Sequence, residues 1–248
     1  MNMRLNKIKS YCRLVCFAGL WMGMVLLPGS CGKMSSNYED FIKDGEIVYT
    51  GRVEGLTAYP GRNRVKLSWA LVSDPKVTLC RVFWNNGADS LSIPVKKTGK
   101  IDTIQVVVNN LNEGLYSFQV YTYDNEGHSS VKSEVAGVSY GDNYANSIFN
   151  RSLKSAKKAT NGKDIWLEWF GAAQQTAVVE INYTNGGGQP ATLLLTERFD
   201  NLGRSRGFSN TDTLYNYKAG ATFNYRTGFL PGKEAIDTFY TGYKAVTP

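Results

Sequence analysis

The same spaced pattern of apolar residues occurs twice in this 248-residue chain, about 100 residues apart. Val65-x-Leu67-x-Trp69 returns as Ile165-x-Leu167-x-Trp169. Val82-x-Trp84-Asn85-Asn86-Gly87 returns as Ile181-x-Tyr183-Thr184-Asn185-Gly186, and GLYSFQV at 114–120 has a looser echo in GATFNYRT at 220–227. Apolar residues that alternate with a period of two are typical of β-strands with one buried face. The duplication therefore predicts an all-β chain with two similar domains in tandem.

Turn-forming residues divide the first half into short strands. The turn signals are Tyr59-Pro60-Gly61, Asp74-Pro75, Asn86-Gly87, Lys97–Lys100, Glu113-Gly114 and Asn125–Gly127. Between them we expect strands at 46–54, 64–71, 77–85, 90–96, 103–110, 115–123 and 130–139. Seven short strands in about 95 residues are typical of an immunoglobulin-like sandwich. We expect one sandwich over 45–140, a linker over 141–150 and a second sandwich over 151–248.

Two aromatic residues make this expectation more specific. A tryptophan on the second core strand, Trp69, and a tyrosine that enters a later strand, Tyr116, are the pattern of fibronectin type III domains. The tyrosine hydroxyl should bond to the preceding turn. Phe223 takes its place in the second half and has no hydroxyl. We therefore expect the second sandwich to diverge from the first.

The motifs between about residue 38 and residue 155 resemble those of one family. The ordered set is Arg64-Val65-x-Leu67-x-Trp69, Asp74-Pro75, Val82-x-Trp84-Asn85-Asn86-Gly87-Ala88-Asp89-Ser90, Glu113-Gly114-x-Tyr116-x-Phe118, Tyr121-Thr122-Tyr123-Asp124-x-x-Gly127-x-Ser129 and Tyr140-Gly141-Asp142-x-Tyr144. It resembles a family of Bacteroidetes outer-membrane lipoproteins that carry a domain of unknown function. The resemblance implies a fibronectin type III-like fold, a lipid anchor and frequent association with glycan-utilisation systems. It implies no activity and no catalytic residue.

Residues 1–30 have the features of a lipoprotein signal peptide. Four basic residues and no acid precede fourteen uncharged residues at 14–27, and Pro28-Gly29-Ser30 leads to Cys31. A basic region, an apolar core and a small-residue exit are typical of a secretory signal. We expect cleavage between Ser30 and Cys31, acylation of Cys31 and a polar tether over 31–44. An uncleaved helix is the alternative, but fourteen residues are short for a membrane span and Pro28 would end the helix.

Loss of the leader changes the charge and the cysteine content. The full chain has a formal net charge of +7, and removing the four basic residues of 1–30 lowers it to +3. Nucleic acid is therefore an unfavoured partner. A small basic cluster is typical of a solvated edge or a linker: Lys154, Lys157 and Lys158. Only Cys80 stays free in the mature chain, on an alternating strand, so we expect a buried thiol and no intrachain disulfide.

Aromatic residues are the candidates for a binding surface, because aromatic rings stack on sugars and anchor interfaces. Three tryptophans occupy inward positions of the repeated strands and should lie in the core: Trp69, Trp84 and Trp169. Trp166 has the opposite parity to Trp169 and should face outward, over an interdomain surface or as a ligand platform. Alternation should also expose some of the tyrosines on the last strands: Tyr215, Tyr217, Tyr240 and Tyr243.

The residue pattern predicts no catalytic residue, metal or cofactor. The single histidine, His128, lies in a polar turn, where we expect an exposed loop residue. Asp124, Asn125 and Glu126 could offer oxygen ligands to Ca²⁺, but they lack the spacing of an EF-hand and a tight turn explains them.

Carboxylates and glycines point to no reaction either. Asp89, Glu113 and Glu168 belong to no motif that would pair them as the acid and base of a glycosidase. Gly186–Gly188 lacks the following Lys-Ser/Thr of a phosphate loop and predicts a hairpin turn.

The leading functional hypothesis is a lipid-anchored, non-enzymatic binding or scaffold protein of the outer membrane, accessory to glycan capture or uptake. Its partner would be a glycan or a protein complex of glycan uptake. The second hypothesis is a structural or adhesive protein–protein module. The third is an unrecognised glycoside hydrolase. Surface-exported lipoproteins of this phylum often carry acidic residues directly after the lipidated cysteine, but here the first acidic residue after Cys31 is Glu39. The sequence therefore does not decide whether the protein faces the outside or the periplasm.

Overall fold

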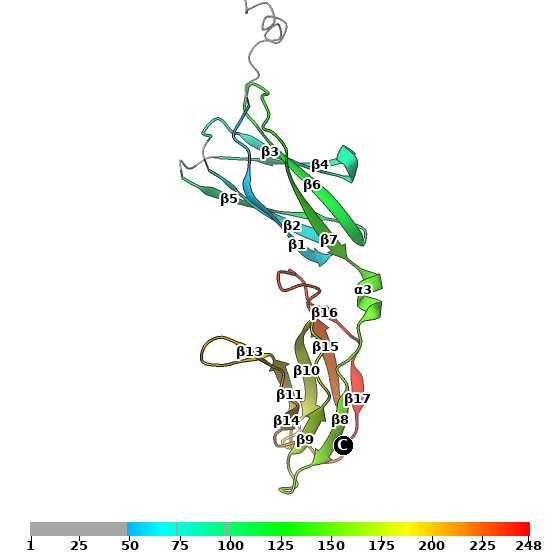
Figure 1. Ribbon diagram of the computed structural model, residues 1–248. Helices are drawn as coiled ribbons and strands as arrows, with labels where there is room; N and C mark the ends of the chain where they lie inside the picture. Colours follow the sequence, from blue (N-terminus) through cyan, green and yellow to red (C-terminus); the bar gives the residue numbers. More distant parts are fainter. Residues whose placement is uncertain (1–48, 73, 97, 99) are drawn as a thin grey trace, which may run out of the picture. The chain divides into compact units, whose positions relative to one another are not determined.

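The computed structural model describes residues 49–248 except 73, 97 and 99, and this part of the chain is built almost entirely from β-strands (Figure 1). The predicted all-β class is confirmed. The predicted leader, Cys31 and the predicted tether lie outside the described residues. In the part of the chain that is described, no helix is long and apolar enough to cross a membrane.

Seven strands form what we call the first module, residues 49–140. They are β1 (Glu54–Arg62), β2 (Arg64–Leu71), β3 (Leu79–Trp84), β4 (Asp89–Pro94), β5 (Asp102–Asn109), β6 (Gly114–Tyr123) and β7 (Ser133–Tyr140), with a short 3₁₀ turn η1 (Asn85–Gly87) between β3 and β4. β1, β2 and β5 pair in one layer, and β4, β3, β6 and β7 pair in the other. The ends of β1 and β7 pair in parallel. This is the strand arrangement of a fibronectin type III-like sandwich.

Alternation along the strands builds the core of the first module. On β2, every second side chain is buried and the side chains between them are half-buried. Burying one large apolar side chain contributes about 1.5–3 kcal/mol, so these positions supply much of the stability. The fully buried side chains include Val65, Leu67, Trp69, Val82, Phe118 and Val120.

The first predicted strand and the first predicted turn are wrong. Residues 49–53 are not a strand, and Tyr59-Pro60-Gly61 lies inside β1. The chain reverses instead at Asn63, which has a φ of 52°, a left-handed conformation that asparagine tolerates. Proline is tolerated at position 60 because only β2 pairs with β1 there, and β1 pairs with β7 only from Gly61 onward. The missing N–H of Pro60 therefore leaves no hydrogen bond to a second strand unmade.

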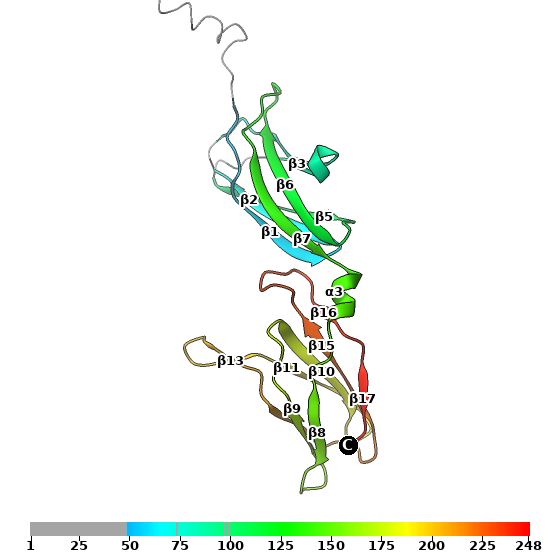
Figure 2. The ribbon, with the colours of Figure 1, turned by 45° about the vertical axis from the view of Figure 1, so that its right-hand side comes forward.

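The second module, residues 151–248, repeats the order of pairings. Its strands are β8 (Leu153–Lys158), β9 (Ile165–Trp169), β10 (Thr176–Thr184), β11 (Pro190–Thr196), β12 (Arg198–Phe199), β13 (Ser205–Gly207), β14 (Thr211–Leu214), β15 (Phe223–Phe229), β16 (Phe239–Tyr240) and β17 (Lys244–Val246). β8, β9 and β14 pair in one layer, while β11, β10 and β15 pair in the other with β16 and β17 beside β15. β12 and β13 form a hairpin that projects from these layers (Figures 1 and 2).

The repeated motifs occupy corresponding strands of the two modules. The Trp69 and Trp169 motifs lie on β2 and β9, and the motifs that begin at Val82 and Ile181 lie on β3 and β10. Trp69 and Trp169 are buried, and Trp84 packs half-buried against the first core, as predicted. Each module has its own cluster of buried residues. The sequence repeat therefore reflects a repeated pairing pattern.

The segment predicted as a linker contains one short helix, α3 (Asp142–Ser147). The carboxylate of Glu113 accepts hydrogen bonds from the amides of Asn143 and Tyr144, at 2.8 and 2.9 Å. These bonds satisfy two amide groups that the first turn of a helix leaves free. Glu113 thus has a structural role at the junction.

Contacts between the two modules centre on Asp237, which precedes β16. Its carboxylate accepts hydrogen bonds from Arg64 Nε at 2.9 Å and from the Arg62 amide at 2.8 Å. The amide of Ile236 donates to the carbonyl of Pro60 at 2.8 Å. Bonding to the Arg64 guanidinium lowers the pKa of Asp237 below its ordinary value. We call this group of contacts the Asp237 junction.

Candidate functional site

An open hollow lies on the outward face of β8, β9 and β14. Trp166 on β9 pairs in register with Lys157 on one side and Thr213 on the other. Two residues along the strand, Glu168 lies between Ser155 and Thr211 in the same way. The hollow has a volume of about 550 Å³, and its lining includes these six residues: Ser155, Lys157, Trp166, Glu168, Thr211 and Thr213. We call it the Trp166 hollow.

Trp166 faces outward, as its parity predicted, with 54% of its surface exposed. The neighbours on β9, Leu167 and Trp169, are buried on the opposite side. Two roles were considered for Trp166, an interdomain surface and a ligand platform. The residues that line the Trp166 hollow all belong to the second module, which fits the role of a ligand platform.

Glu168 in the hollow is paired with Lys154, which lies beside the hollow. Lys154 Nζ lies 2.6 Å from Glu168 Oε1, and Ser155 Oγ lies 3.5 Å from Glu168 Oε2. The hydrogen bond from Lys154 is the main reason why the pKa of Glu168 falls below its ordinary value. Lys157 adds only a weak Coulombic effect there, and it forms no salt bridge with any residue that the structure describes. The hollow therefore combines an exposed indole, hydroxyl groups and one cation that is not neutralised by a close carboxylate.

Tyr240 and Tyr243 meet on the other layer of the second module, around Arg226. The Arg226 guanidinium carbon lies 4.1 Å from the centre of the Tyr240 ring and 4.6 Å from that of Tyr243. Arg226 also bonds to Glu180 at 2.8 Å. A hydrogen bond from Tyr243 is the main reason why the pKa of Glu180 is lowered. We call these four residues the Arg226 patch.

Sequence reasoning selected both tyrosines but missed the arginine that joins them. Arg226 follows Tyr225 on β15, and the two side chains point to opposite sides of the sheet. Because the register between β10 and β15 was not predicted, nothing placed Arg226 opposite Glu180. Thr211 and Thr213 were missed for a similar reason, since β14 was not predicted as a strand.

The prediction for Tyr217 as a surface residue is wrong, whereas Tyr215 is exposed. Tyr217 has only 6% of its surface exposed and packs against Tyr183 and Phe223 in the core. Its hydroxyl donates a hydrogen bond to the carbonyl of Ala221. The chain turns after β14, and this turn breaks the strict alternation on which the prediction rested. Tyr215 is 68% exposed, and its carbonyl accepts a bond from Tyr183.

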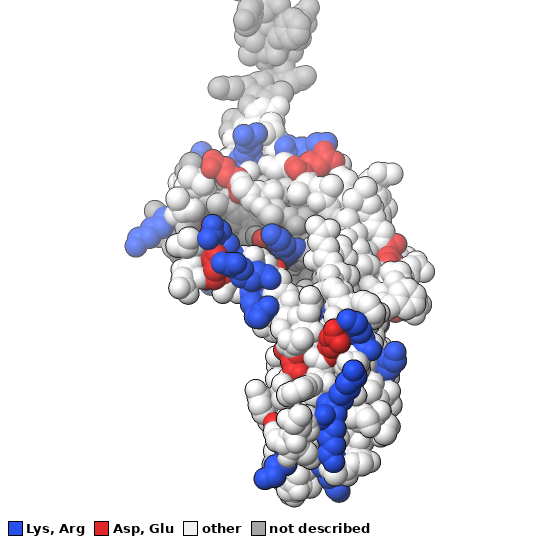
Figure 3. Space-filling view, turned by 60° about the horizontal axis from the view of Figure 1, so that its bottom comes forward, with Lys and Arg blue, Asp and Glu red and all other residues white. Residues whose placement is uncertain are grey.

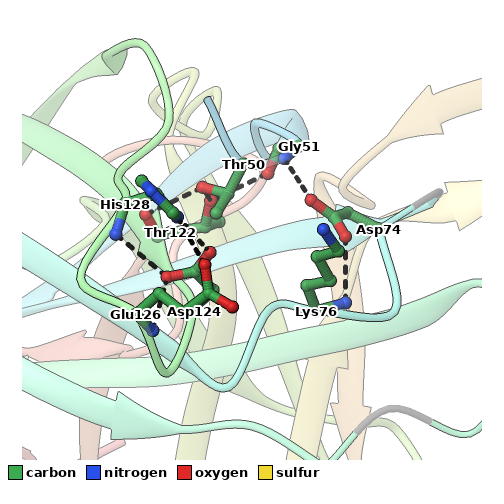
Figure 4. A network of polar contacts seen from close by, with 8 residues as sticks. All are labelled: Thr50, Gly51, Asp74, Lys76, Thr122, Asp124, Glu126 and His128. Carbon is green, nitrogen blue, oxygen red and sulfur yellow. Dashed lines mark hydrogen bonds and ion pairs between the residues drawn. The ribbon is translucent and has the colours of Figure 1, made fainter. Parts of the chain in front are cut away.

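The only histidine closes a turn between β6 and β7. His128 Nδ1 lies 2.8 Å from Asp124 Oδ2, and the amides of Glu126 and His128 both donate to Asp124 Oδ1 at 2.9 Å (Figure 4). Burial opposes ionisation of Asp124, but the bonds from His128 and Glu126 outweigh it and lower the pKa. Asp124, Glu126 and His128 could hold a metal ion by distance alone. Their mutual bonds account for the turn without a metal ion.

The other carboxylates considered for catalysis have separate structural partners. Asp89 accepts a hydrogen bond from Asn85 at 2.6 Å, Glu113 bonds to the start of α3, and Glu168 bonds to Lys154. Gly186–Gly188 forms a hairpin turn, as predicted, in which the Asn185 side chain accepts bonds from the amides of Gly187 and Gln189. Cys80 is fully buried, as predicted, and burial raises its pKa to about 11.

Charge on the face shown in Figure 3 is mixed. Lys and Arg side chains are scattered over it with Asp and Glu among them, and most of the surface is uncharged. A protein that binds nucleic acid through its backbone usually gathers its cations in one patch or stripe. In this view Lys and Arg form several short, separate runs and not one continuous patch.

Comparisons with known proteins place the chain among uncharacterised domains. The model of the family DUF4998, described as a domain of unknown function, matches residues 31–239. No curated protein matches the chain. Among solved structures, a two-fibronectin type-III domain segment from chicken tenascin is 14% identical, with 79% of this chain and 98% of that chain covered and a TM-score of 0.31. The FN1–FN3 domains of chicken CNTN1 are 9% identical, with 82% and 69% covered and a TM-score of 0.42. Both similarities are too distant to say what this chain binds.

Proposed function

The chain belongs to the DUF4998 family, whose function is unknown, and we propose from its own surface that it is a lipid-anchored, non-enzymatic binding module of the cell envelope. Its role would be accessory to the capture or uptake of glycans. The fibronectin type III-like arrangement suits a structural or adhesive module, since such sandwiches present side chains on rigid sheet faces.

The observation that carries the proposal is the exposed indole of Trp166 between two polar neighbours in register. Aromatic rings offer a flat apolar face, and sugars have an apolar face of C–H groups with hydroxyls around its edge. Lys157 and Thr213 lie on the strands to either side of Trp166, within reach of those hydroxyls. A pyranose ring that stacked on Trp166 would thus find hydrogen-bonding groups at its edges.

The non-enzymatic part of the proposal is supported by the state of the carboxylate in the hollow. A glycosidase needs one carboxylic acid that donates a proton and a second carboxylate as base or nucleophile. Glu168 is held ionised by its bond to Lys154, with a lowered pKa, which is the opposite of what a proton donor requires. The hollow therefore suits binding better than hydrolysis.

Binding of the full chain to a panel of neutral and acidic polysaccharides tests the site. We expect at least one to bind, and Trp166→Ala to weaken that binding at least tenfold. Phe199→Ala is the matched control, because Phe199 is an exposed aromatic on the β12–β13 hairpin. The site is wrong if Trp166→Ala binds like the wild type or if no polysaccharide binds.

Cell fractionation and intact-mass analysis test the anchor. We expect the mature chain to begin at an acylated Cys31 and to sediment with the outer membrane, whereas Cys31→Ala should be released. A Cys31→Ala chain that stays bound to the membrane would refute lipid anchoring.

The second candidate function, a protein-contact module, is favoured by the Arg226 patch. Tyrosine and arginine are enriched at the centres of protein interfaces. Tyr240 is 42% exposed. Leu194, which pairs in register with Glu180 on the neighbouring strand β11, is 59% exposed. A protein partner cross-linked through this face in cells should be lost in Tyr240→Ala but kept in Trp166→Ala.

A further inference from the structure

We propose that the saccharide recognised by the Trp166 hollow is acidic, with a carboxylate on the sugar ring. This inference rests on the proposed carbohydrate site and names its ligand class.

The charges in the hollow do not cancel. Glu168 is paired at 2.6 Å with Lys154, which lies beside the hollow. Asp212, the other acid of the lining, is in register with the buried Leu167, on the opposite side of β14 from Thr211 and Thr213, where its charged neighbours are Arg151 and Arg198. Lys157 is exposed, has no salt bridge among the described residues, and stands beside Trp166 in the strand register. The outward-facing side chains of the hollow therefore carry one positive charge without a paired carboxylate, next to the aromatic platform. A ligand that brings one negative charge per bound ring would complete the charge balance.

The spacing of the strands fits a carboxylate on the ring. Neighbouring strands lie about 4.8 Å apart, so the backbone of β8 runs roughly one sugar-ring width from that of β9. A ring stacked on Trp166 would direct a substituent on one edge toward β8. The flexible four-carbon side chain of Lys157 can reach such a group, whereas Thr213 on the opposite edge offers only a short hydroxyl.

The polar groups around Glu168, two residues along β9 from Trp166, fit the rest of a saccharide. Ser155 and Thr211 flank Glu168 and present hydroxyls, and Glu168 presents carboxylate oxygens that accept bonds from sugar hydroxyls. Because Glu168 is already paired, its charge repels an acidic ligand less than a free carboxylate would. The side chains around Trp166 thus favour an anion, and those around Glu168 favour hydroxyl groups.

The test compares acidic saccharides with uncharged forms of the same rings. The probes are tetragalacturonate, tetramannuronate and tetraguluronate, each titrated into the full chain beside its methyl ester. We expect at least one tetrauronate to bind about fivefold more tightly than its ester, as one exposed ion pair allows. Raising the salt to about 0.5 M should remove this preference, because salt screens exposed charges.

Two variants with the same change of charge locate the effect. Lys157→Gln should lower the affinity for the tetrauronate to that of the ester and leave the ester unchanged. Lys158→Gln is the matched control, since it is exposed on the same strand but lines a different hollow. Circular dichroism checks that both variants fold. An equal loss in both variants would overturn the assignment to Lys157.

The failures of the inference and of the proposed function are distinguishable. If the tetrauronates and their esters bind equally, or if only neutral saccharides bind in a Trp166-dependent way, the acidic ligand is refuted and the carbohydrate site stands. If no saccharide of either panel binds, both are refuted. A preference for the tetrauronate that is lost in Lys157→Gln and kept in Lys158→Gln supports the inference.

Discussion

The hydroxyl of Tyr217 donates a hydrogen bond to the carbonyl of Ala221, four residues further along the chain. In the first module, the Tyr116 hydroxyl donates to the carbonyl of Asn112, four residues earlier, at 3.1 Å. Each bond closes the loop that leads into a central strand, β15 or β6. Phe223 takes the place of Tyr116 in the second module and has no hydroxyl. Tyr217, at the start of the loop before β15, supplies the corresponding hydrogen bond instead.

Removing either hydroxyl should lower the stability of its own module. We expect Tyr116→Phe to lower the free energy of unfolding by about 1 kcal/mol, the usual net value of one hydrogen bond. Tyr217→Phe should cost more, because Tyr217 is buried and its loss leaves a carbonyl without its partner. Urea denaturation measures both. Tyr215→Phe, with an exposed side chain, should change little, and an equal effect in all three variants would contradict the argument.

The Asp237 junction should weaken in acid. The pKa of Asp237 is lowered in the folded chain, mainly by Arg64, so its contribution is fully present above the ordinary value of about 3.9. It is lost as the pH falls through the lower folded value. We expect the protection factor of the Ile236 amide, which bonds to Pro60, to fall below about pH 4 in the wild type.

The Asp237→Asn variant separates this effect from general acid unfolding. The protection factor of its Ile236 amide should already be lower at neutral pH and should fall little further on acidification. Asp142→Asn is the control, because the bond of Asp142 to Arg62 is 3.3 Å long and highly exposed, and such pairs contribute little. Identical pH profiles for wild type and Asp237→Asn would show that another group controls the junction.

Cys80 should resist alkylation in the folded chain. Its side chain is fully buried, and burial raises its pKa to about 11, so the reactive thiolate is scarce at pH 8. We expect iodoacetamide to label Cys80 only after denaturation, with peptide mapping to identify the site. Rapid labelling under native conditions would mean that the first module opens locally.

Divalent cations should not stabilise the turn at Asp124. Both oxygens of its carboxylate already bond to His128 or to backbone amides, so a cation would have to displace bonds that hold the turn. We expect the melting temperature to be the same in EDTA and in millimolar Ca²⁺. A rise with Ca²⁺ that disappears in Asp124→Asn would show that the three side chains form a metal site after all.

Much of the fold follows from the sequence because burial dominates along each strand. Alternation was enough to orient Trp69, Trp169 and Trp166 correctly. It was not enough for Tyr59-Pro60-Gly61, whose turn-forming residues lie within a strand at a position where proline meets no second neighbour. Local propensity describes what a segment permits, and the neighbouring strands decide among the permitted conformations.

The candidate sites show a different limit. Trp166 was found from its own strand, but Lys157 and Thr213 join it only through the register of β8 and β14. Likewise, Arg226 reaches Glu180 through the pairing of β10 with β15. Register depends on contacts between residues far apart in the chain, which one sequence does not reveal. Single side chains of a site were therefore predictable, whereas their combination was not.

The parallel pairing of β1 with β7 has a mechanical consequence. A chain anchored before the first module and bound to a ligand through the second, as proposed here, would be under tension, and in the first module that pull would enter before Glu54 and leave after Tyr140. Because Gly61 and Arg62 pair with Ser139 and Tyr140 in parallel, the pull slides the two strands past each other instead of peeling them apart. Hydrogen bonds loaded in shear must break together, so this short pairing should resist the mechanical unfolding of the first module.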